Sequence, residues 1–295
     1  MSQLSQSSSS SSVNLSHLPW LGPVLLFDSL HFIWAAMMVP YVSAEIAAPF
    51  VMSIATIEIG LYGLITKRLS LEPLRKHFWF FAAIGFMIGA STYTGYLAVH
   101  FIDAGTTSLL SKSGVIFSVA LGLIWLRERF TPLQIIGTLI AVIGTFVIAY
   151  QSDARLQWGT LIMLAGTFAY TCHFAVVKRY GSEMDFVNFL FYRMLLTALF
   201  LILLSGTRGT LSWPSSMGWL VVALTATFDV VISRTFYYSA LRRLDMSLLS
   251  VITTLGPVAT IMWAFLFFET FPSIRQLIGG AAVLIGVLIV TLLNR

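Results

Sequence analysis

Six charged side chains stand inside long apolar stretches of this sequence. They are three acids and three bases: Asp28, Glu58, Asp229, Lys112, Arg193 and Arg234. A charge at the centre of a bilayer costs roughly 2.5–3.5 kcal/mol on insertion scales, so such residues usually face a partner or a cavity. Two explanations stay open: salt bridges between helices, or a polar pocket that binds a charged or zwitterionic molecule or carries protons.

One acid stands close to a histidine in the sequence. Asp28 and His31 lie three positions apart and share one face of a helix. A carboxylate hydrogen-bonded to an imidazole can carry a proton, although the same pair could be a structural hydrogen bond between two buried polar groups. Asp28, His31 and Glu58 are therefore the candidates for proton coupling or for a salt bridge.

Aromatic residues accompany the charges at helical spacing. Tyr93 and Tyr96 belong to one stripe, and Asp229 and Tyr237 fall on another. Such stripes are more often packing than ligand contacts, yet a buried tyrosine hydroxyl needs a hydrogen-bond partner. We therefore include both stripes among the candidate substrate contacts.

Lys112 is the leading candidate for contact with a carboxylate or phosphate group. Its other role would be snorkelling, because it lies in the outer half of its apolar segment. The candidate substrate contacts are Lys112, Tyr93, Tyr96, Ser111, Arg193, Asp229, Arg234, Tyr237 and His173. The histidines lack metal-site spacing, so the sequence predicts neither a metal site nor a cofactor.

The composition places these residues in a membrane. Of the 295 residues, 58% are hydrophobic and 10% are charged, whereas a soluble domain has about 25% charged residues. Apolar runs of roughly 20 residues can cross a bilayer core, and they are predicted near 20–39, 46–66, 78–101, 106–126, 132–150, 158–177, 185–205, 217–241, 247–268 and 275–293. The expected fold is an all-α polytopic membrane protein with ten transmembrane helices. A single cysteine excludes a disulfide framework.

The basic residues predict the orientation of these helices. Three of them, Arg155, Arg208 and Arg275, fall in connections on one side. The connections on the other side hold Lys67, Arg68, Arg75, Lys76, Arg127, Arg129, Lys178, Arg179, Arg242, Arg243 and Arg295. By the positive-inside rule both termini are cytoplasmic, and the Ser-rich residues 1–18 are expected to be a disordered cytoplasmic tail.

The sequence contains an internal repeat. An offset of 142 maps His31-Phe32 onto His173-Phe174 and Asp103 onto Asp245. Each copy spans five predicted helices, an odd number, so the second copy enters the membrane in the opposite orientation. Inverted repeats are typical of secondary transporters that alternate access around a midplane site. The predicted units are residues 19–150 and 151–295.

Glycine and proline mark two further features. Glycines spaced by seven residues occur in the last helix of each half and predict a face for close helix packing: Gly137, Gly144, Gly279 and Gly286. The pair Gly256-Pro257 interrupts the ninth predicted helix, because proline breaks the backbone ladder. We expect a hinge or a binding contact there, with a merely structural kink as the alternative.

These motifs resemble the drug/metabolite transporter superfamily in its EamA-type branch. The second half carries the resemblance best, in Tyr238 to Leu241, Leu255-Gly256-Pro257, Glu269, Gln276, Gly279 and Gly286, and Arg193 stands where the family often has an arginine. The first half departs from the pattern, since Ile116 replaces the proline and Glu58 lies near an expected arginine. The resemblance implies two five-helix halves and a central cavity, and it is weak for substrate.

The expected function is export of a small polar or zwitterionic metabolite, such as an amino acid, across the inner (plasma) membrane, with proton coupling as an option. No nucleotide-binding or hydrolase motif is present, so the sequence does not predict an enzyme. The alternatives are a lipophilic-cation (multidrug) exporter, a nucleotide-sugar exchanger and a non-transporting membrane subunit. The expected partners are a small-molecule substrate and the lipid bilayer, without nucleic acid, and a homodimer is left open.

Overall fold

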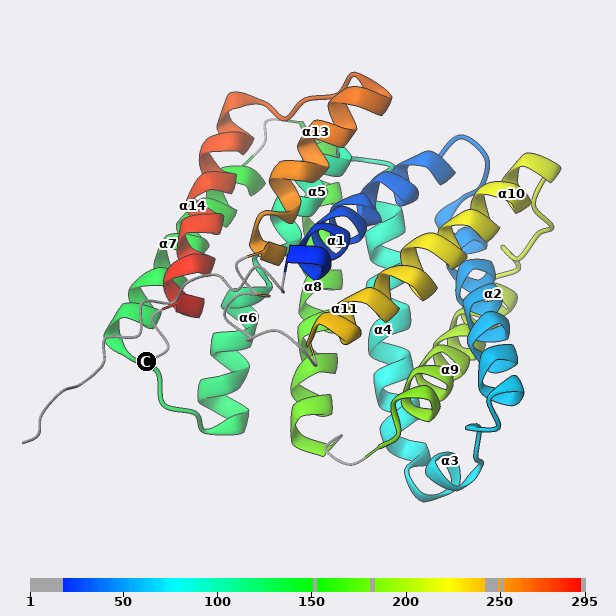
Figure 1. Cartoon of the computed structure of the whole chain (residues 1–295). Coiled ribbons are helices and arrows are strands. Elements are labelled where there is room, and N and C mark those ends of the chain that lie inside the picture. Colours follow the sequence, from blue (N-terminus) through cyan, green and yellow to red (C-terminus); the bar gives the residue numbers. More distant parts are fainter. Residues whose placement is uncertain (1–17, 151–152, 181–183, 242–248, 250–251, 293–295) are drawn as a thin grey trace, which may run out of the picture.

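The computed structural model describes residues 18–150, 153–180, 184–241, 249 and 252–292, and their regular secondary structure is helical (Figure 1). The helices are α1 (Leu18–Met38), α2 (Ala44–Ile65), α3 (Glu72–Lys76), α4 (Phe78–Ala98), α5 (Ala104–Ser111), α6 (Gly114–Leu121), η2 (Gly122–Leu126), α7 (Pro132–Ala149), α8 (Ala154–Tyr180), α9 (Phe186–Thr207), α10 (Ser216–Leu224), η3 (Thr225–Ile232), α11 (Ser233–Leu241), α13 (Gly256–Phe268) and α14 (Ile274–Leu292). The predicted tail lies outside these residues, except for Leu18.

Eight helical stretches in the described part of the chain are long and apolar enough to cross a membrane. Two shorter apolar helices, Gly22–Met38 and Ile252–Phe268, lie where the first and ninth spans are predicted. The start of the ninth predicted span falls outside the described residues. The prediction of a polytopic helical membrane protein is confirmed, whereas the number ten and the orientation of the termini stay predictions.

Large apolar side chains on the outer surface agree with a lipid environment. Trp79 and Ile124 are each 82% exposed, and they lie on different helices. A soluble protein rarely exposes apolar side chains over wide contiguous areas. In a bilayer the same side chains meet lipid tails, so they need no protein partner.

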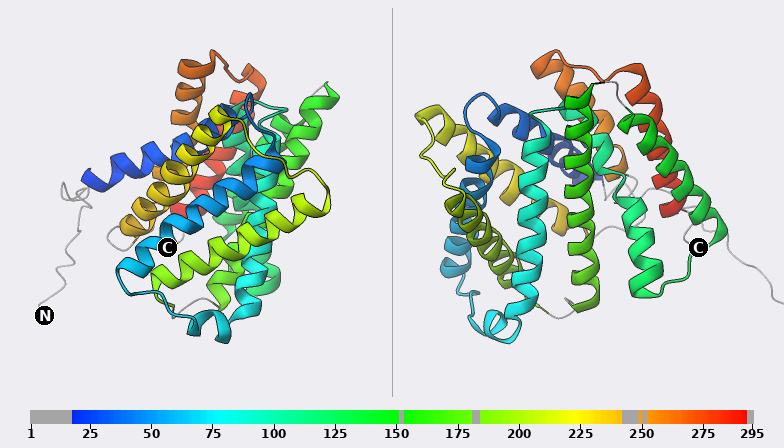
Figure 2. Two further views of the ribbon diagram at one scale, coloured as in Figure 1. Left: turned by 90° about the vertical axis from the view of Figure 1, so that its right-hand side faces the viewer. Right: turned by 180° about the vertical axis from the view of Figure 1, so that it is seen from behind.

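The long helices pair side by side around a central pair. Seen from behind, α4 and α8 run together through the middle, with α2 and α9 on one side and α7 and α14 on the other (Figure 2). Helix α1 and the run α10–η3–α11 cross the opposite face (Figure 1). The α6–α7 connection and the end of α8 lie at the lower edge of Figure 1, whereas the α13–α14 connection lies at its upper edge. We call the lower edge the Glu128 end.

The predicted glycine face is confirmed in the contact between α7 and α14. A Cβ atom added at Gly144 would stand 2.5 Å from the carbonyl oxygen of Gly279, and one at Gly137 would stand 2.9 Å from that of Gly286. Only glycine allows the two backbones to approach this closely. These glycines therefore fix one wall of the bundle.

Two spans are interrupted near the middle of the bundle. Helix α13 begins at Gly256 with Pro257 in its first turn, which confirms the predicted break in the ninth helix. The fourth span breaks between α5 and α6 at Lys112 and Ser113, where no proline stands. There the Ser113 hydroxyl donates to the Leu110 carbonyl at 2.6 Å, and such side-chain bonds compete with the helix ladder.

Candidate functional site

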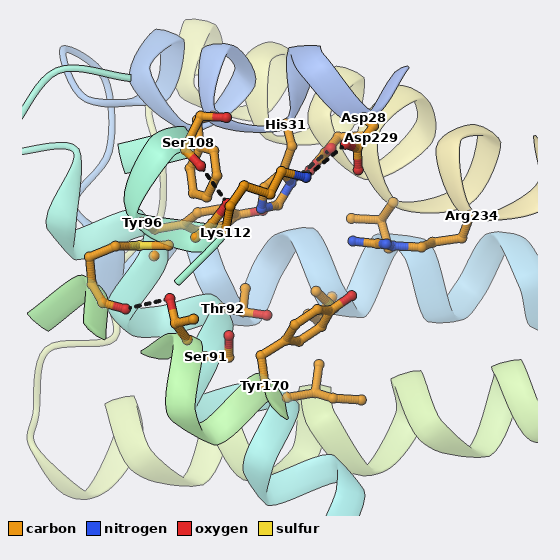
Figure 3. Close-up of a pocket in the computed structure, with 18 of the residues that line it drawn as sticks. Asp28, His31, Ser91, Thr92, Tyr96, Ser108, Lys112, Tyr170, Asp229 and Arg234 are labelled. Carbon is orange, nitrogen blue, oxygen red and sulfur yellow. Dashed lines mark hydrogen bonds and ion pairs between the residues drawn. The ribbon is translucent and has the colours of Figure 1, made fainter. Parts of the chain in front are cut away.

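A cavity of about 210 Å³ lies inside the bundle, between α1, α2, α4, α5, α8, α9 and η3–α11 (Figure 3). Its wall brings together eight of the predicted site residues: Asp28, His31, Tyr96, Ser111, Lys112, Arg193, Asp229 and Arg234. They come from helices far apart in the sequence. Five of the six intramembrane charges thus gather at one place, as the hypothesis of a central polar pocket requires, and Glu58 is the exception.

The first charged pair joins α1 to the break in the fourth span. Lys112 Nζ lies 3.4 Å from Asp28 Oδ2, and the two side chains are 21% and 29% exposed. Lys112 caps the C-terminus of α5, and its side chain extends into the cavity (Figure 3). The lysine therefore contacts an acid in the wall and does not snorkel.

The second charged pair joins α1 to η3. His31 Nδ1 lies 2.9 and 2.8 Å from the two carboxylate oxygens of Asp229, which is only 2% exposed. An ionised carboxylate can only accept hydrogen bonds, so Nδ1 carries the hydrogen. Nε2 then remains for a second hydrogen-bond partner.

The predicted hydrogen bond between Asp28 and His31 is wrong. Asp28 and His31 do share one face of α1. However, Lys112 at the end of α5 binds Asp28, and Asp229 of η3 binds His31. Pairing between helices satisfies four groups, whereas a bond between Asp28 and His31 would leave Lys112 and Asp229 in a mostly apolar bundle without those partners.

Two buried polar side chains at or near the cavity have no hydrogen-bond partner among the described residues. The Tyr96 hydroxyl is one, and Tyr96 lines the wall at 3% exposure. Both ring nitrogens of His173 are the other case, and this residue lies next to the wall residue Tyr170, with ring centroids 5.6 Å apart. Buried polar groups normally have a partner, so the Tyr96 hydroxyl is a candidate position for a water molecule or a ligand atom.

Three predicted residues lie away from the cavity. The Tyr93 hydroxyl donates to Glu45 Oε1 at 3.0 Å. Glu58 accepts a hydrogen bond from the Thr227 hydroxyl at 2.6 Å. Tyr237 packs on the apolar cluster around Val24.

The absence of Tyr237 from the cavity wall has a local cause. The segment Thr225–Ile232 is π-helical, and its wider turn changes the angle between residues on either side of it. A stripe drawn at α-helical spacing from Asp229 therefore does not reach the cavity at Tyr237. The same segment turns Asp229 toward His31.

The structure adds wall residues that the sequence analysis did not select: Ser91, Thr92, Thr167 and Tyr170. The repeat offset contains a signal for three of them, and for the first two it maps Ser91-Thr92 onto Ser233-Arg234. The same offset maps the candidate residue Asp28 onto Tyr170, whereas Thr167 corresponds to Leu25 and carries no such signal.

Gly256, predicted as a hinge, lies directly against the first charged pair. A Cβ atom added there would stand 2.7 Å from Asp28 Oδ2 and 3.7 Å from Lys112 Nζ.

Within the described residues, no group of three His, Cys, Asp or Glu side chains could hold a metal ion. The wall offers hydroxyls, two carboxylates and several bases, a set suited to reversible binding and proton transfer.

Comparison with known proteins identifies relatives across the whole chain. The EamA-like transporter family matches residues 20–150 and again residues 157–292. The uncharacterized transporter YyaM of Bacillus subtilis (strain 168) is 23% identical over 280 residues, which cover 89% of each chain. An uncharacterized transporter of Archaeoglobus fulgidus is 25% identical over 277 residues, 92% of this chain and 96% of its own.

Two further similarities concern a named transporter and a solved fold. A probable terminal-alkyne amino-acid exporter of Streptantibioticus cattleyicolor is 27% identical over 198 residues, 65% of each chain. One crystal structure of a protein superposes with a TM-score of 0.66 at 19% identity, covering 95% of this chain and 99% of that one. With the family matched in both halves and membrane-crossing helices around a charged cavity, the chain belongs to the EamA-like transporter family of the drug/metabolite transporter superfamily and is a multi-pass membrane protein.

Proposed function

We propose that this protein is a secondary-active transporter that exports a small polar or zwitterionic metabolite, such as an amino acid. The observation that carries the proposal is the cavity wall with its two pairs, Asp28–Lys112 and His31–Asp229. A substrate carboxylate would contact Lys112, and a substrate ammonium would contact Asp28. Access would alternate between the two membrane faces around this cavity.

The size of the cavity supports a small substrate. Its volume of about 210 Å³ lies below the roughly 300–1,000 Å³ of pockets for drug-sized ligands. An amino acid fits this limit better than a nucleotide sugar does. The similarity to a protein named as a probable amino-acid exporter points to the same class.

The pair His31–Asp229 supports proton coupling. Its imidazole is 34% exposed, whereas its carboxylate is almost fully buried. The exposed ring can take a proton from the cavity, and the buried acid would stabilise the charged ring. We further propose that both termini are cytoplasmic and that the protein resides in the inner (plasma) membrane, as the distribution of basic residues indicates.

Flux into liposomes that contain only this chain tests the proposal. Purified protein is first screened by thermal shift against amino acids and other metabolites, since a bound ligand raises the melting temperature. Transport of the ligands found is then measured with labelled compound under an imposed proton gradient. Absence of binding and flux for every zwitterionic compound would refute the proposed substrate class, and flux by Lys112→Ala equal to wild type would remove the leading site residue.

One observation favours a second candidate, a lipophilic-cation exporter. Glu58 accepts a hydrogen bond from the Thr227 hydroxyl, and within the described residues it has no basic partner. An acid of this kind inside a membrane could attract a lipophilic cation. Ethidium resistance in cells that express the protein, lost in Glu58→Gln, would support this candidate over the first.

A further inference from the structure

A second cavity of about 230 Å³ lies between α6 and α8, toward the Glu128 end. Its wall is mostly apolar, with Val115 and Phe174 among its members, and it includes the hydroxyls of Ser118 and Thr171. It has no role in the site described above.

The two cavities lie one after the other along the same two helical faces. On α8, Thr167 lines the central cavity, and Thr171, one turn further along, lines the second. In the fourth span, Lys112 lines the central cavity, and Val115, three residues later, lines the second. Thr167 and Thr171 share one face of α8. Across the α5–α6 break the Val115 N–H donates to the Lys112 carbonyl at 3.3 Å, so a single seam runs from one cavity to the other.

Gly114 closes this seam between the cavities. A Cβ atom added at Gly114 would stand 3.3 Å from Thr167 Cγ2 and 3.3 Å from Thr171 Oγ1. These two threonines are the wall residues of the central and the second cavity. The barrier between the cavities is therefore one glycine against two small side chains, and it lies just beyond the break between α5 and α6.

An ion pair lies at the outer rim of the second cavity. Lys178 Nζ lies 2.7 Å from Glu128 Oε1, and the lysine side chain is 65% exposed. Arg179 reinforces the closure by donating to the Trp125 carbonyl at 3.3 Å. Exposed ion pairs contribute little to stability, so this rim can open without unfolding the helices.

We infer that the second cavity is a transit site for the transported molecule between the central cavity and the Glu128 end, with Gly114 as the inner barrier and the Glu128–Lys178 pair as the outer one. The inference rests on the proposed function for the identity of the cargo. The apolar wall fits the apolar part of a small zwitterion, while Glu128 and Lys178 offer a partner for each of its charges. The class of ligand is thus a small zwitterion with an apolar side chain.

Thiol labelling tests the route without any substrate. In a Cys172→Ser background, single cysteines at Ser111 (central cavity) and Ser118 (second cavity) react with a membrane-impermeant cationic methanethiosulfonate. The accessible face is defined as the one from which Glu128→Cys reacts. We expect both reporters to react from that face. Failure of either one to react from it would refute the route.

Gly114→Leu then separates the two cavities. Leucine would fill the space against Thr167 and Thr171, so labelling of the Ser111 reporter from the Glu128 face is expected to slow at least tenfold. Labelling of the Ser118 reporter should stay within twofold. Gly206→Leu is the matched control, because nothing lies within 4 Å of a Cβ atom at Gly206. Equal slowing of both reporters, or of neither, would overturn the inferred barrier.

A second variant keeps the test valid where Gly114→Leu lowers the yield of folded protein. Ser118→Trp narrows the second cavity from an exposed wall position, and Ala120→Trp is its exposed control two residues away. Slowing of the Ser111 reporter by Ser118→Trp alone supports the route, and equal rates in both variants contradict it. None of these outcomes depends on the substrate screen, so failure of the route and failure of the proposed function are distinguishable.

Discussion

Replacement of Gly256 by alanine tests whether the Asp28–Lys112 pair is the binding contact. The new Cβ atom would stand 2.7 Å from Asp28 Oδ2, and ordinary contacts begin at 3.4 Å. The carboxylate must therefore move by about 0.7 Å, the difference between these two distances. Its bond to Lys112 Nζ is already long at 3.4 Å, so this shift displaces the acid from the geometry that a substrate ammonium would use.

The expected loss can be estimated from the contact that is disturbed. A hydrogen bond to a charged group contributes about 1.5–3 kcal/mol, which corresponds to about tenfold to hundredfold in affinity. The backbone itself should tolerate the change, because Gly256 is helical and alanine favours a helix over glycine by up to about 1 kcal/mol. Gly256→Ala should thus weaken substrate binding by one to two orders of magnitude without lowering the melting temperature.

The assay compares Gly256→Ala with Gly206→Ala, a helical position where no atom lies within 4 Å of the added Cβ. Substrate affinity is taken from the concentration dependence of liposome flux, and folding from thermal unfolding in detergent. Wild-type affinity in Gly256→Ala would show that the Asp28 carboxylate does not contact the substrate. A large fall in melting temperature would show instead that Gly256 is required for folding.

Three further predictions use other residues of the site and the bundle. Lys112→Ala should abolish flux while leaving membrane insertion and the melting temperature of the detergent-solubilised protein near wild type, since the lysine is partly exposed to the cavity. Asp229→Asn removes the charge next to His31, so the pH dependence of flux should flatten, and an unchanged pH profile would exclude this pair from proton coupling. Gly144→Ile should lower stability by about 1–3 kcal/mol through overpacking of α7 against α14, measured by thermal unfolding against Ile143→Ala on the exposed face.

The sequence could predict features that depend on neighbours along one helix. The apolar runs predicted most of the helices, and the seven-residue glycine spacing predicted a close-packing face on the last helix of each half, which the α7–α14 contact confirms. The break at Gly256 followed from the missing N–H group of Pro257. Each of these depends on local chemistry that one segment carries by itself.

The pairing of charges across helices could not be predicted in this way. The spacing of Asp28 and His31 indicates a shared face, but it does not say which other helix reaches that face. Likewise no proline or glycine marks the π-helical segment around Asp229, so the sequence does not indicate that Tyr237 lies outside the cavity wall. The break at Lys112 depends on serine hydroxyls, which are common in helices that do not break.

Helix α1 forms one charged pair with each predicted half of the chain, and the two pairs differ in chemistry. Its Asp28 pairs with Lys112 inside the first half, whereas its His31 pairs with Asp229 of the second half. The carbonyl of Ser29 also accepts a hydrogen bond from the Thr260 hydroxyl of α13 at 2.7 Å. If the halves move against each other during transport, α1 must part from one of them, so either Asp28–Lys112 or His31–Asp229 must break or shift. Protonation of the His31–Asp229 pair would then change which half α1 stays with, and this arrangement would couple protonation to access without a separate relay.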